Sequence, residues 1–172
     1  MIKIGESAPD FSGVAAYHAG EFKKISLVEY KGKWLVLFFY PRDFTFVCPT
    51  ELREFAKHEK EFADAGASIL AASTDSEWSH KNWFERDLAE VKYPILADTT
   101  QEVSRAYNVL GNDGASQRGT FIVDSEGKLR WMVVSDNSVG RSVKETLRSL
   151  KALQTGALCP IEWEPGDQTL GK

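Results

Sequence analysis

The sequence predicts an α/β fold in which helices cover a mixed central sheet. Apolar runs of strand length alternate along the chain with amphipathic segments of helical length, which is the pattern of a sheet with helices packed against it. Two apolar runs separated by Ser125-Glu126-Gly127 add a hairpin, and therefore an antiparallel pair, to that alternation. The 172 residues suffice for one domain with a substantial apolar core.

The first strong strand signal is the continuous apolar run from Trp34 to Tyr40, which ends at Pro41. Such a run is typical of a strand that is buried on both faces. A helix is expected from Pro49 to about Ala65, because apolar residues recur there at helical spacing along one face. Gly66 then provides a helix stop.

The remaining elements continue the same alternation. We expect strands at 68–73, 94–97, 119–124 and 129–134, and helices at 77–88, 100–107 and 142–154. The segment after Gly156 holds two prolines and further glycines, which favours an irregular extension. The sequence therefore predicts a domain over residues 1–156 and a C-terminal tail over residues 157–172.

Charge and hydropathy exclude some classes of partner. The chain has 21 basic and 25 acidic residues and a net charge of −4, which argues against nucleic acid, since phosphate binding needs a cationic field. No apolar stretch approaches the roughly 20 residues needed to span a bilayer, so no membrane partner is expected. The first residues show no basic leader followed by an apolar run, and we expect a cytoplasmic protein.

Only two cysteines are present, Cys48 and Cys159. A small disulfide scaffold would contain more of them. We expect no bound metal, because the three histidines lie far from either cysteine in the sequence and no paired ligand spacing occurs. The remaining alternatives are two inert buried thiols or a redox-active pair.

Cys48 lies where a buried strand leads, through a short loop, into a helix that begins near Pro49. A sulfur at that position faces unpaired backbone N–H groups and the positive end of the helix dipole, and both favour thiolate over thiol. The alternative is a small apolar side chain that packs among Phe44, Phe46 and Val47.

The pattern Pro41-x-x-x-Thr45-x-x-Cys48 closely resembles the active-site segment of peroxiredoxins, specifically the alkyl hydroperoxide reductase C and typical two-cysteine group. The resemblance extends over nearly the whole chain. It includes the segments 8–11, 73–76, 118–124, 139–141 and 159–163. An arginine before the strand at 119–124 and a cysteine before Trp163 make the combined match specific.

The resemblance implies a role for each matching residue. Cys48 would be the peroxidatic nucleophile, Thr45 would orient the peroxide with its hydroxyl, and Pro41 would shield the pocket from water. Arg118 would hold the thiolate and the charge that develops on the peroxide. The resemblance also implies that Glu51 and Arg141 brace that arginine. Cys159 would be the resolving thiol, contributed by the partner subunit.

The resemblance also implies fold and partners. The fold would be the peroxiredoxin variant of the thioredoxin fold, with an N-terminal hairpin extension. Substrates would be hydrogen peroxide and organic hydroperoxides. The reductant would be a dithiol protein, either thioredoxin-like, a flavoprotein disulfide reductase or a small dithiol protein. The assembly would be a homodimer that can gather into a decameric ring, and no cofactor is implied.

Two other functions stay open from the sequence. One is a chaperone ring that forms on oxidation. The other is a disulfide oxidoreductase of the same fold, which would normally use a Cys-x-x-Cys pair, and the sequence contains none.

Overall fold

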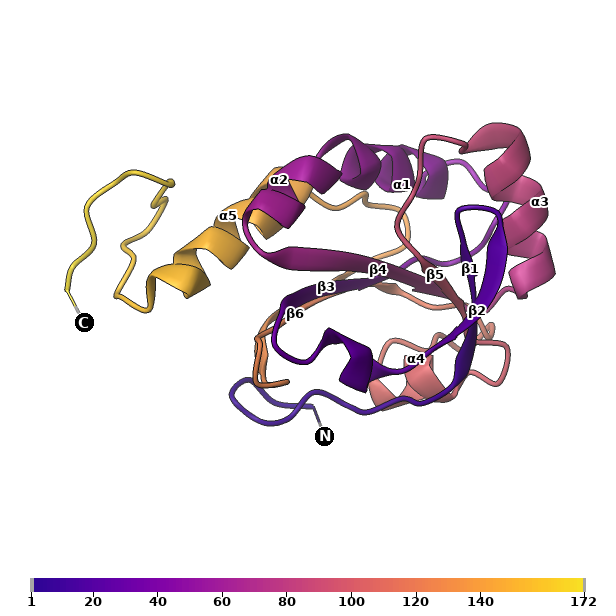
Figure 1. Cartoon of the computed structure of the whole chain (residues 1–172), viewed down its shortest axis with the longest axis horizontal. Coiled ribbons are helices and arrows are strands. Elements are labelled where there is room, and N and C mark those ends of the chain that lie inside the picture. The colour runs from indigo at the N-terminus through magenta and orange to yellow at the C-terminus, as the bar shows by residue number, and fades with distance from the viewer. Residues whose placement is uncertain (1, 172) are drawn as a thin grey trace.

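The computed structural model describes residues 2–171 and contains a seven-stranded mixed sheet with helices on both faces (Figure 1). The strand order is β2-β1-β5-β4-β3-β6-β7. The strands are β1 (Val14–His18), β2 (Glu21–Ile25), β3 (Trp34–Phe39), β4 (Ala67–Ser73), β5 (Ile95–Ala97), β6 (Arg118–Val123) and β7 (Leu129–Ser135). The helices are η1 (Leu27–Tyr30), α1 (Cys48–Lys57), α2 (Glu59–Asp64), α3 (Glu77–Asp87), α4 (Glu102–Ala106) and α5 (Val143–Thr155). The predicted α/β class is confirmed.

The predicted buried strand is β3, an interior strand between β4 and β6. It runs parallel to β4 and antiparallel to β6. Val36 and Phe38 belong to the apolar cluster under α1, α2, α3 and α5, whereas Leu35 and Leu37 belong to the cluster on the α4 side. Both faces of this strand are therefore covered, which explains why its sequence is apolar without alternation.

The two expected hairpins lie at opposite edges of the sheet. β1 and β2 form an antiparallel N-terminal hairpin, and β1 joins the sheet by antiparallel pairing with β5. β6 and β7 form the second hairpin across the turn at 125–127, so β7 is the other edge strand. The fold class implied by the resemblance includes this N-terminal hairpin.

The single helix predicted at 49–65 is wrong in two details. It begins one residue earlier, at Cys48, and it divides into α1 and α2 at His58, whose backbone angles (φ −97°, ψ 5°) leave the α-helical region. The His58 ring is hydrogen-bonded on both sides of this break, to Glu54 Oε1 at 3.0 Å and to Glu61 Oε1 at 2.6 Å. Pro49 therefore occupies the second helical position.

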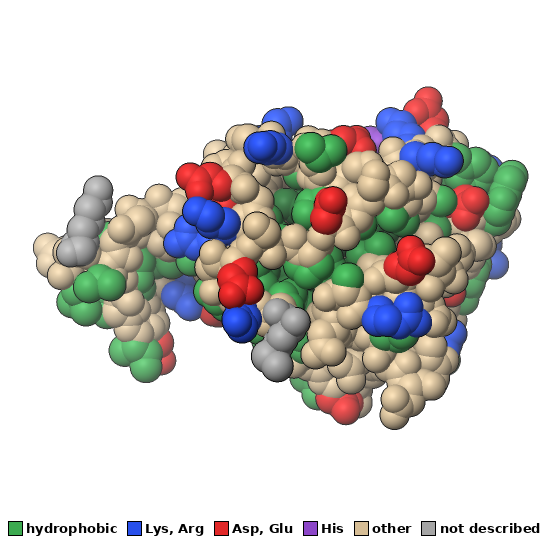
Figure 2. Space-filling model, turned by 90° about the horizontal axis from the view of Figure 1, so that it is seen from below, with side chains coloured by type: hydrophobic (Ala, Val, Ile, Leu, Met, Phe, Trp, Pro, Cys, Tyr) green, Lys and Arg blue, Asp and Glu red, His purple; other side chains and the backbone are tan. Residues whose placement is uncertain are grey.

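α5 carries the tail at its C-terminal end. The Ser142 hydroxyl caps the start of α5, and Gly156, with φ of 62°, ends it. The described part of the tail, up to residue 171, contains no helix or strand, and it closes on itself through backbone hydrogen bonds of Leu158 with Gly171 and Leu170. It projects from the body, and hydrophobic side chains gather on its surface (Figures 1 and 2). Among the described residues, no helix is both long and apolar enough to cross a membrane.

Candidate active site

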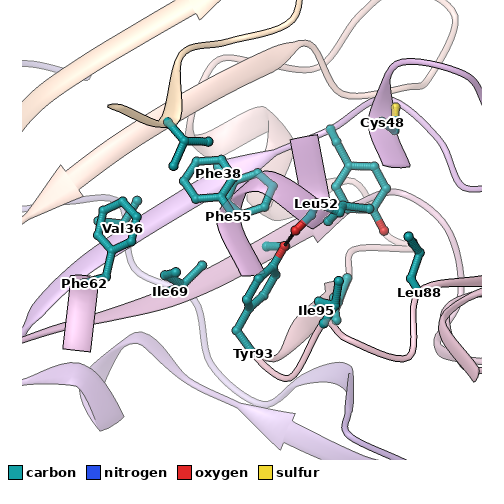
Figure 3. Close-up of a cluster of buried hydrophobic side chains, with 14 of the residues drawn as sticks. Val36, Phe38, Cys48, Leu52, Phe55, Phe62, Ile69, Leu88, Tyr93 and Ile95 are labelled. Carbon is teal, nitrogen blue, oxygen red and sulfur yellow. Dashed lines mark hydrogen bonds between the residues drawn. The ribbon is translucent and has the colours of Figure 1, made fainter. Parts of the chain in front are cut away.

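Cys48 begins α1, directly after the loop that leaves β3. Its side chain is only 1% exposed. It lies at one end of a buried apolar cluster to which α1 also contributes Leu52 and Phe55 (Figure 3). The phenol of Tyr93 donates to the Leu52 carbonyl at 2.7 Å and ties the first turns of α1 to the chain before β5. The sulfur is thus held at a helix start, as the sequence predicts.

Arg118 opens β6, next to β3, and reaches across to α1. Its Nη1 lies 3.5 Å from Cys48 Sγ and 2.7 Å from Glu51 Oε2. Its Nε and Nη2 both donate to the Asn137 carbonyl, at 3.0 and 2.8 Å. The guanidinium plane is therefore fixed from two sides and directs one N–H toward the sulfur.

Arg141 approaches Glu51 from the loop between β7 and α5. Its Nε donates to Oε1 at 2.9 Å and its Nη2 to Oε2 at 3.1 Å, a two-pronged pair. Nη1 and Nη2 also reach the carbonyls of Gly119 and Phe39. Burial lowers the pKa of Arg141, and the hydrogen bond to Glu51 opposes that shift. Glu51 thus joins two arginines that come from different elements.

The buried charged side chains around Cys48 carry an excess of one positive charge. The side chains of Arg118, Arg141 and Glu51 are 4%, 3% and 2% exposed. Two guanidinium groups and one carboxylate leave one excess positive charge in a site that water does not screen. A buried charge is expensive without a partner, so the site favours a further negative charge beside Arg118.

Thr45 and Pro41 lie on the loop before Cys48. Their contacts differ from those of the charged side chains Glu51, Arg118 and Arg141. The Thr45 hydroxyl donates to the Arg42 carbonyl at 2.9 Å and makes no hydrogen bond to Cys48. Thr45 and Pro49 line an open pocket of about 520 Å³. Pro41 is half-buried at the end of β3. Thr45 thus lies on the wall of this open pocket, with its hydroxyl hydrogen used within the loop.

Cys159 lies apart from this group. It is half-buried at the C-terminal end of α5, and both cysteines are free thiols. The tail continues on the α2 side of the molecule, away from the end where α1 begins (Figure 1). Within one chain, the structure therefore brings together Cys48, Glu51, Arg118 and Arg141, and it leaves Cys159 outside.

A buried polar network supports the loop before Cys48, and no sequence pattern revealed it. Asp43 accepts a hydrogen bond from the Tyr40 phenol at 2.7 Å and is bonded to His80 Nδ1 at 2.8 Å. His80 is fully buried, and its Nε2 meets the Leu96 carbonyl at 3.1 Å. Next to Asp43, Phe44 has a φ of 56°, which is unusual for a bulky side chain. This network fixes the loop that carries Thr45.

Comparison with known proteins agrees with this geometry. The model of the AhpC/TSA family matches residues 4–132. A putative peroxiredoxin in the rubredoxin operon of Clostridium pasteurianum is 49% identical over 97% of this chain and 98% of its own length. A thioredoxin peroxidase of Trypanosoma brucei rhodesiense is 47% identical over 98% of this chain and 89% of its own length.

Among solved structures, the reduced 2-Cys peroxiredoxin of Plasmodium vivax superposes with a TM-score of 0.92 at 34% sequence identity, covering 96% of this chain and 91% of that one. The two proteins therefore share their fold along almost the whole length of this chain, from the N-terminal hairpin into the tail. The chain belongs to the AhpC/TSA family and is a peroxiredoxin, an oxidoreductase that reduces peroxides with a cysteine thiol.

Proposed function

We propose that Cys48 is the peroxidatic residue and attacks hydrogen peroxide and organic hydroperoxides as the thiolate. The sulfur bonds to one peroxide oxygen while the O–O bond breaks. The other oxygen leaves with the bonding electron pair and takes up a proton as water or an alcohol. Cys48 becomes a sulfenic acid. No other residue in the described chain combines a thiol with buried cationic donors.

The observation that carries the proposal is the Arg118 guanidinium, which touches both Cys48 Sγ and Glu51. A free thiol of ordinary pKa is about 7% ionised near pH 7.4, so complete ionisation gains at most roughly 15-fold in rate. A larger gain comes from donors that align the peroxide and stabilise the leaving oxygen. Arg118 is positioned to do both, with Glu51 and Arg141 holding it in place.

Thr45 and Pro41 complete the proposed pocket. The Thr45 hydroxyl retains lone pairs that can accept the peroxide hydrogen while its own hydrogen bonds to the Arg42 carbonyl. Pro41 ends β3 beside the loop and offers an apolar wall without an N–H group. These two roles rest on the position of the loop and on the family motif.

For the second step we propose that Cys159 of the partner subunit condenses with the Cys48 sulfenic acid. A disulfide requires Cα atoms within about 4.4–6.8 Å. In one chain the tail lies away from the start of α1, which favours pairing between two subunits (Figure 1). Residues 1–156 would then form the catalytic domain, and the tail 157–172 would serve the other subunit.

The two sheet edges support a homodimer. The edge strand β2 carries Lys23, Lys24 and Glu21, and charged edges resist pairing. The opposite edge, β7, presents Met132, Val133 and Val134 at 39–44% exposure. An apolar edge strand of this kind suits antiparallel pairing with its own copy across a two-fold axis. Such dimers could gather into a decameric ring.

The reductant and compartment follow from the same chemistry. The Cys48–Cys159 disulfide must be reduced by a dithiol protein, either thioredoxin-like, a flavoprotein disulfide reductase or a small dithiol protein. The relative from Trypanosoma brucei rhodesiense is described as a thioredoxin peroxidase, which favours the first of these. We place the protein in the cytoplasm, where such reductants keep thiols reduced. Neither a chaperone ring nor a disulfide oxidoreductase is favoured by the comparisons.

A non-reducing gel after one equivalent of peroxide tests the two-cysteine cycle. The wild type should give a disulfide-linked dimer, and both Cys48→Ser and Cys159→Ser should abolish it. Cys48→Ser should also lose peroxide consumption with a dithiol reductant. Turnover that survives Cys48→Ser would refute the peroxidatic role, and a monomeric disulfide in the wild type would refute the exchange between subunits.

A further inference from the structure

The loop between β3 and α1 contains a strained backbone position directly before Thr45. Phe44 has a φ of 56°, a left-handed conformation that a bulky side chain rarely adopts. Such a conformation is costly and persists only where the surrounding structure enforces it. Because Thr45 is the next residue, the direction of its side chain depends on what holds the loop in this conformation.

Asp43, on the other side of Phe44, is held at its backbone and at both carboxylate oxygens. Its backbone N–H donates to Asp75 Oδ2 at 2.9 Å. One carboxylate oxygen accepts from the Tyr40 phenol at 2.7 Å. The other accepts from the Ser79 hydroxyl at 2.7 Å and lies 2.8 Å from His80 Nδ1. The loop is thus tied to residues that follow β3 and β4 and to α3.

His80 connects these contacts to the sheet. The side chains of His80 and Asp43 are 0% and 1% exposed, and His80 Nε2 donates to the Leu96 carbonyl of β5 at 3.1 Å. A carbonyl and a carboxylate can only accept, so a second ring hydrogen lies between Nδ1 and Asp43. Burial raises the pKa of the Tyr40 phenol, and the charge of Asp43 acts in the same direction, so the phenol stays a donor. Asp43 therefore accepts charge-assisted hydrogen bonds in a site that water does not screen.

These contacts are separate from those that surround the sulfur. None of the hydrogen bonds described for Asp43 and His80 involves Glu51, Arg118 or Arg141. Arg118 reaches the site from β6, whereas His80 is bonded to β5, on the other side of β3 in the sheet. One group therefore acts on the sulfur, and the other places the loop that carries the hydroxyl.

We propose that Asp43 and His80 are positioning residues for the peroxide step: they fix the loop before α1 so that the Thr45 hydroxyl oxygen faces the peroxide. This inference rests on the proposed roles of Cys48 and Thr45. In that step an S–O bond forms and the O–O bond breaks. The departing oxygen leaves with the electron pair and takes up a proton. The inference concerns the reduced protein, before the first turn of α1 opens.

Asp43→Ala removes every side-chain contact of Asp43 and lets the loop leave its strained conformation. The second-order rate of Cys48 with hydrogen peroxide should fall roughly ten- to hundredfold, because misplacing an aligned group by about 1 Å can cost that much. The thiolate fraction of Cys48 should stay within about twofold of the wild type, since Arg118 and Glu51 keep their contacts.

Asp43→Asn is the conservative variant. Its amide oxygen can accept from Tyr40, and its NH2 group can donate to the Ser79 oxygen and to Nδ1 of a His80 ring that keeps its hydrogen on Nε2. The side-chain contacts are then preserved without the charge. This variant should therefore recover the peroxide rate to within about threefold of the wild type.

Asp124→Ala is the matched control for the loss of a hydrogen-bonded carboxylate. Asp124 is 7% exposed, as Asp43 is, and it accepts hydrogen bonds from two backbone amides and from Arg130. It lies beyond the C-terminal end of β6, whereas the start of this strand contacts the sulfur. The control should keep the wild-type peroxide rate and thiolate fraction.

Stopped-flow mixing of each reduced full-length protein with hydrogen peroxide gives the peroxide rate, and alkylation of Cys48 over a range of pH gives the thiolate fraction. If Asp43→Ala does not fold, His80→Ala serves; it should show the same selective loss by a smaller factor, because two donors still bind Asp43. An unchanged peroxide rate in both alanine variants, equal losses of rate and thiolate fraction, or Asp43→Asn as slow as Asp43→Ala would overturn the positioning role. A wild type that forms no sulfenic acid at Cys48 would instead overturn the proposed function.

Discussion

At the residue scale, the site depends on one carboxylate that joins two arginines. Glu51 binds Arg118 with one oxygen and Arg141 with both, and all three side chains are buried. Since Arg118 alone touches the sulfur, Glu51 and Arg141 act on Cys48 through it. The site is therefore sensitive to residues that never meet the peroxide.

Arg118→Met tests the direct contact. The variant keeps an unbranched side chain of similar length but loses the donor, so we expect peroxide reduction to fall by more than the change in thiolate fraction accounts for. Thiolate fraction is measured from the pH dependence of alkylation at Cys48, and activity from the second-order rate with hydrogen peroxide. Equal losses in both quantities would refute a role for Arg118 beyond ionising the sulfur.

Glu51→Gln tests the buried pairing. Removing the carboxylate charge takes away the one buried carboxylate that pairs with both guanidinium groups, and we expect the free energy of unfolding to fall by about 3–5 kcal/mol. Glu90→Gln is the control: it breaks the exposed pair with Arg53 and should cost about 0–1 kcal/mol. Urea denaturation of the reduced proteins measures both. Similar losses for the two variants would show that burial does not set the cost.

At the element scale, the two cysteines lie at different helix ends: α1 and α5 share one buried apolar cluster, but Cys48 stands at the start of α1 and Cys159 lies beyond the end of α5. Cys48 begins α1 and is buried, and Cys159 follows the last turn of α5. A disulfide between them needs both sulfurs to leave these positions. The first turn of α1 and the tail must therefore open while the sheet stays intact.

Hydrogen exchange measures that opening. We expect amides in residues 48–52 and in the tail at 157–171 to lose protection in the disulfide form relative to the reduced form, because local unfolding exposes their backbone. β3 and β4 serve as the internal control and should keep their protection. Equal protection of the first α1 turn and the tail in both redox forms would contradict the opening.

At the scale of the whole molecule, the two edges of the sheet differ in what they can bind. The β2 edge is charged, and the β7 edge is apolar and exposed. An exposed apolar edge strand is a site for pairing with another strand. From this asymmetry we expect self-association to use the β7 edge.

Val133→Lys places a charge in the middle of that edge. We expect it to shift the reduced protein from dimer toward monomer in sedimentation velocity at micromolar concentration, because a lysine there would have to be buried against its own copy. Lys24→Glu, on the β2 edge, should leave the sedimentation unchanged. A β7 variant that sediments as the wild type does would remove this edge from the interface.

Much of this arrangement could be predicted from local patterns. The apolar run of β3, the hairpin of β6 and β7, and the amphipathic face of α5 each follow from periodicity and turn residues, which act over a few positions. The placement of Cys48 at a helix start is equally local, because the strand, the loop and Pro49 are adjacent in the chain. The break at His58 was not predicted, because the apolar pattern continues through it. The break is accompanied by hydrogen bonds from the His58 ring to Glu54 and Glu61, one on each side.

The sequence patterns determined the fold class, the order of the elements from β3 onward and the cysteine at the start of α1, whereas the N-terminal hairpin was implied only by the family resemblance. The family resemblance named Arg118, Glu51 and Arg141, and only the tertiary structure decided how these side chains are held around that cysteine. Arg118 lies 70 residues from Cys48 and Arg141 lies 90 residues from Glu51 along the chain. Their guanidinium groups are held largely by backbone carbonyls such as those of Asn137 and Phe39. A carbonyl is common to every residue, so no sequence pattern marks it, and only the pairing of β3 with β6 brings these groups to the sulfur.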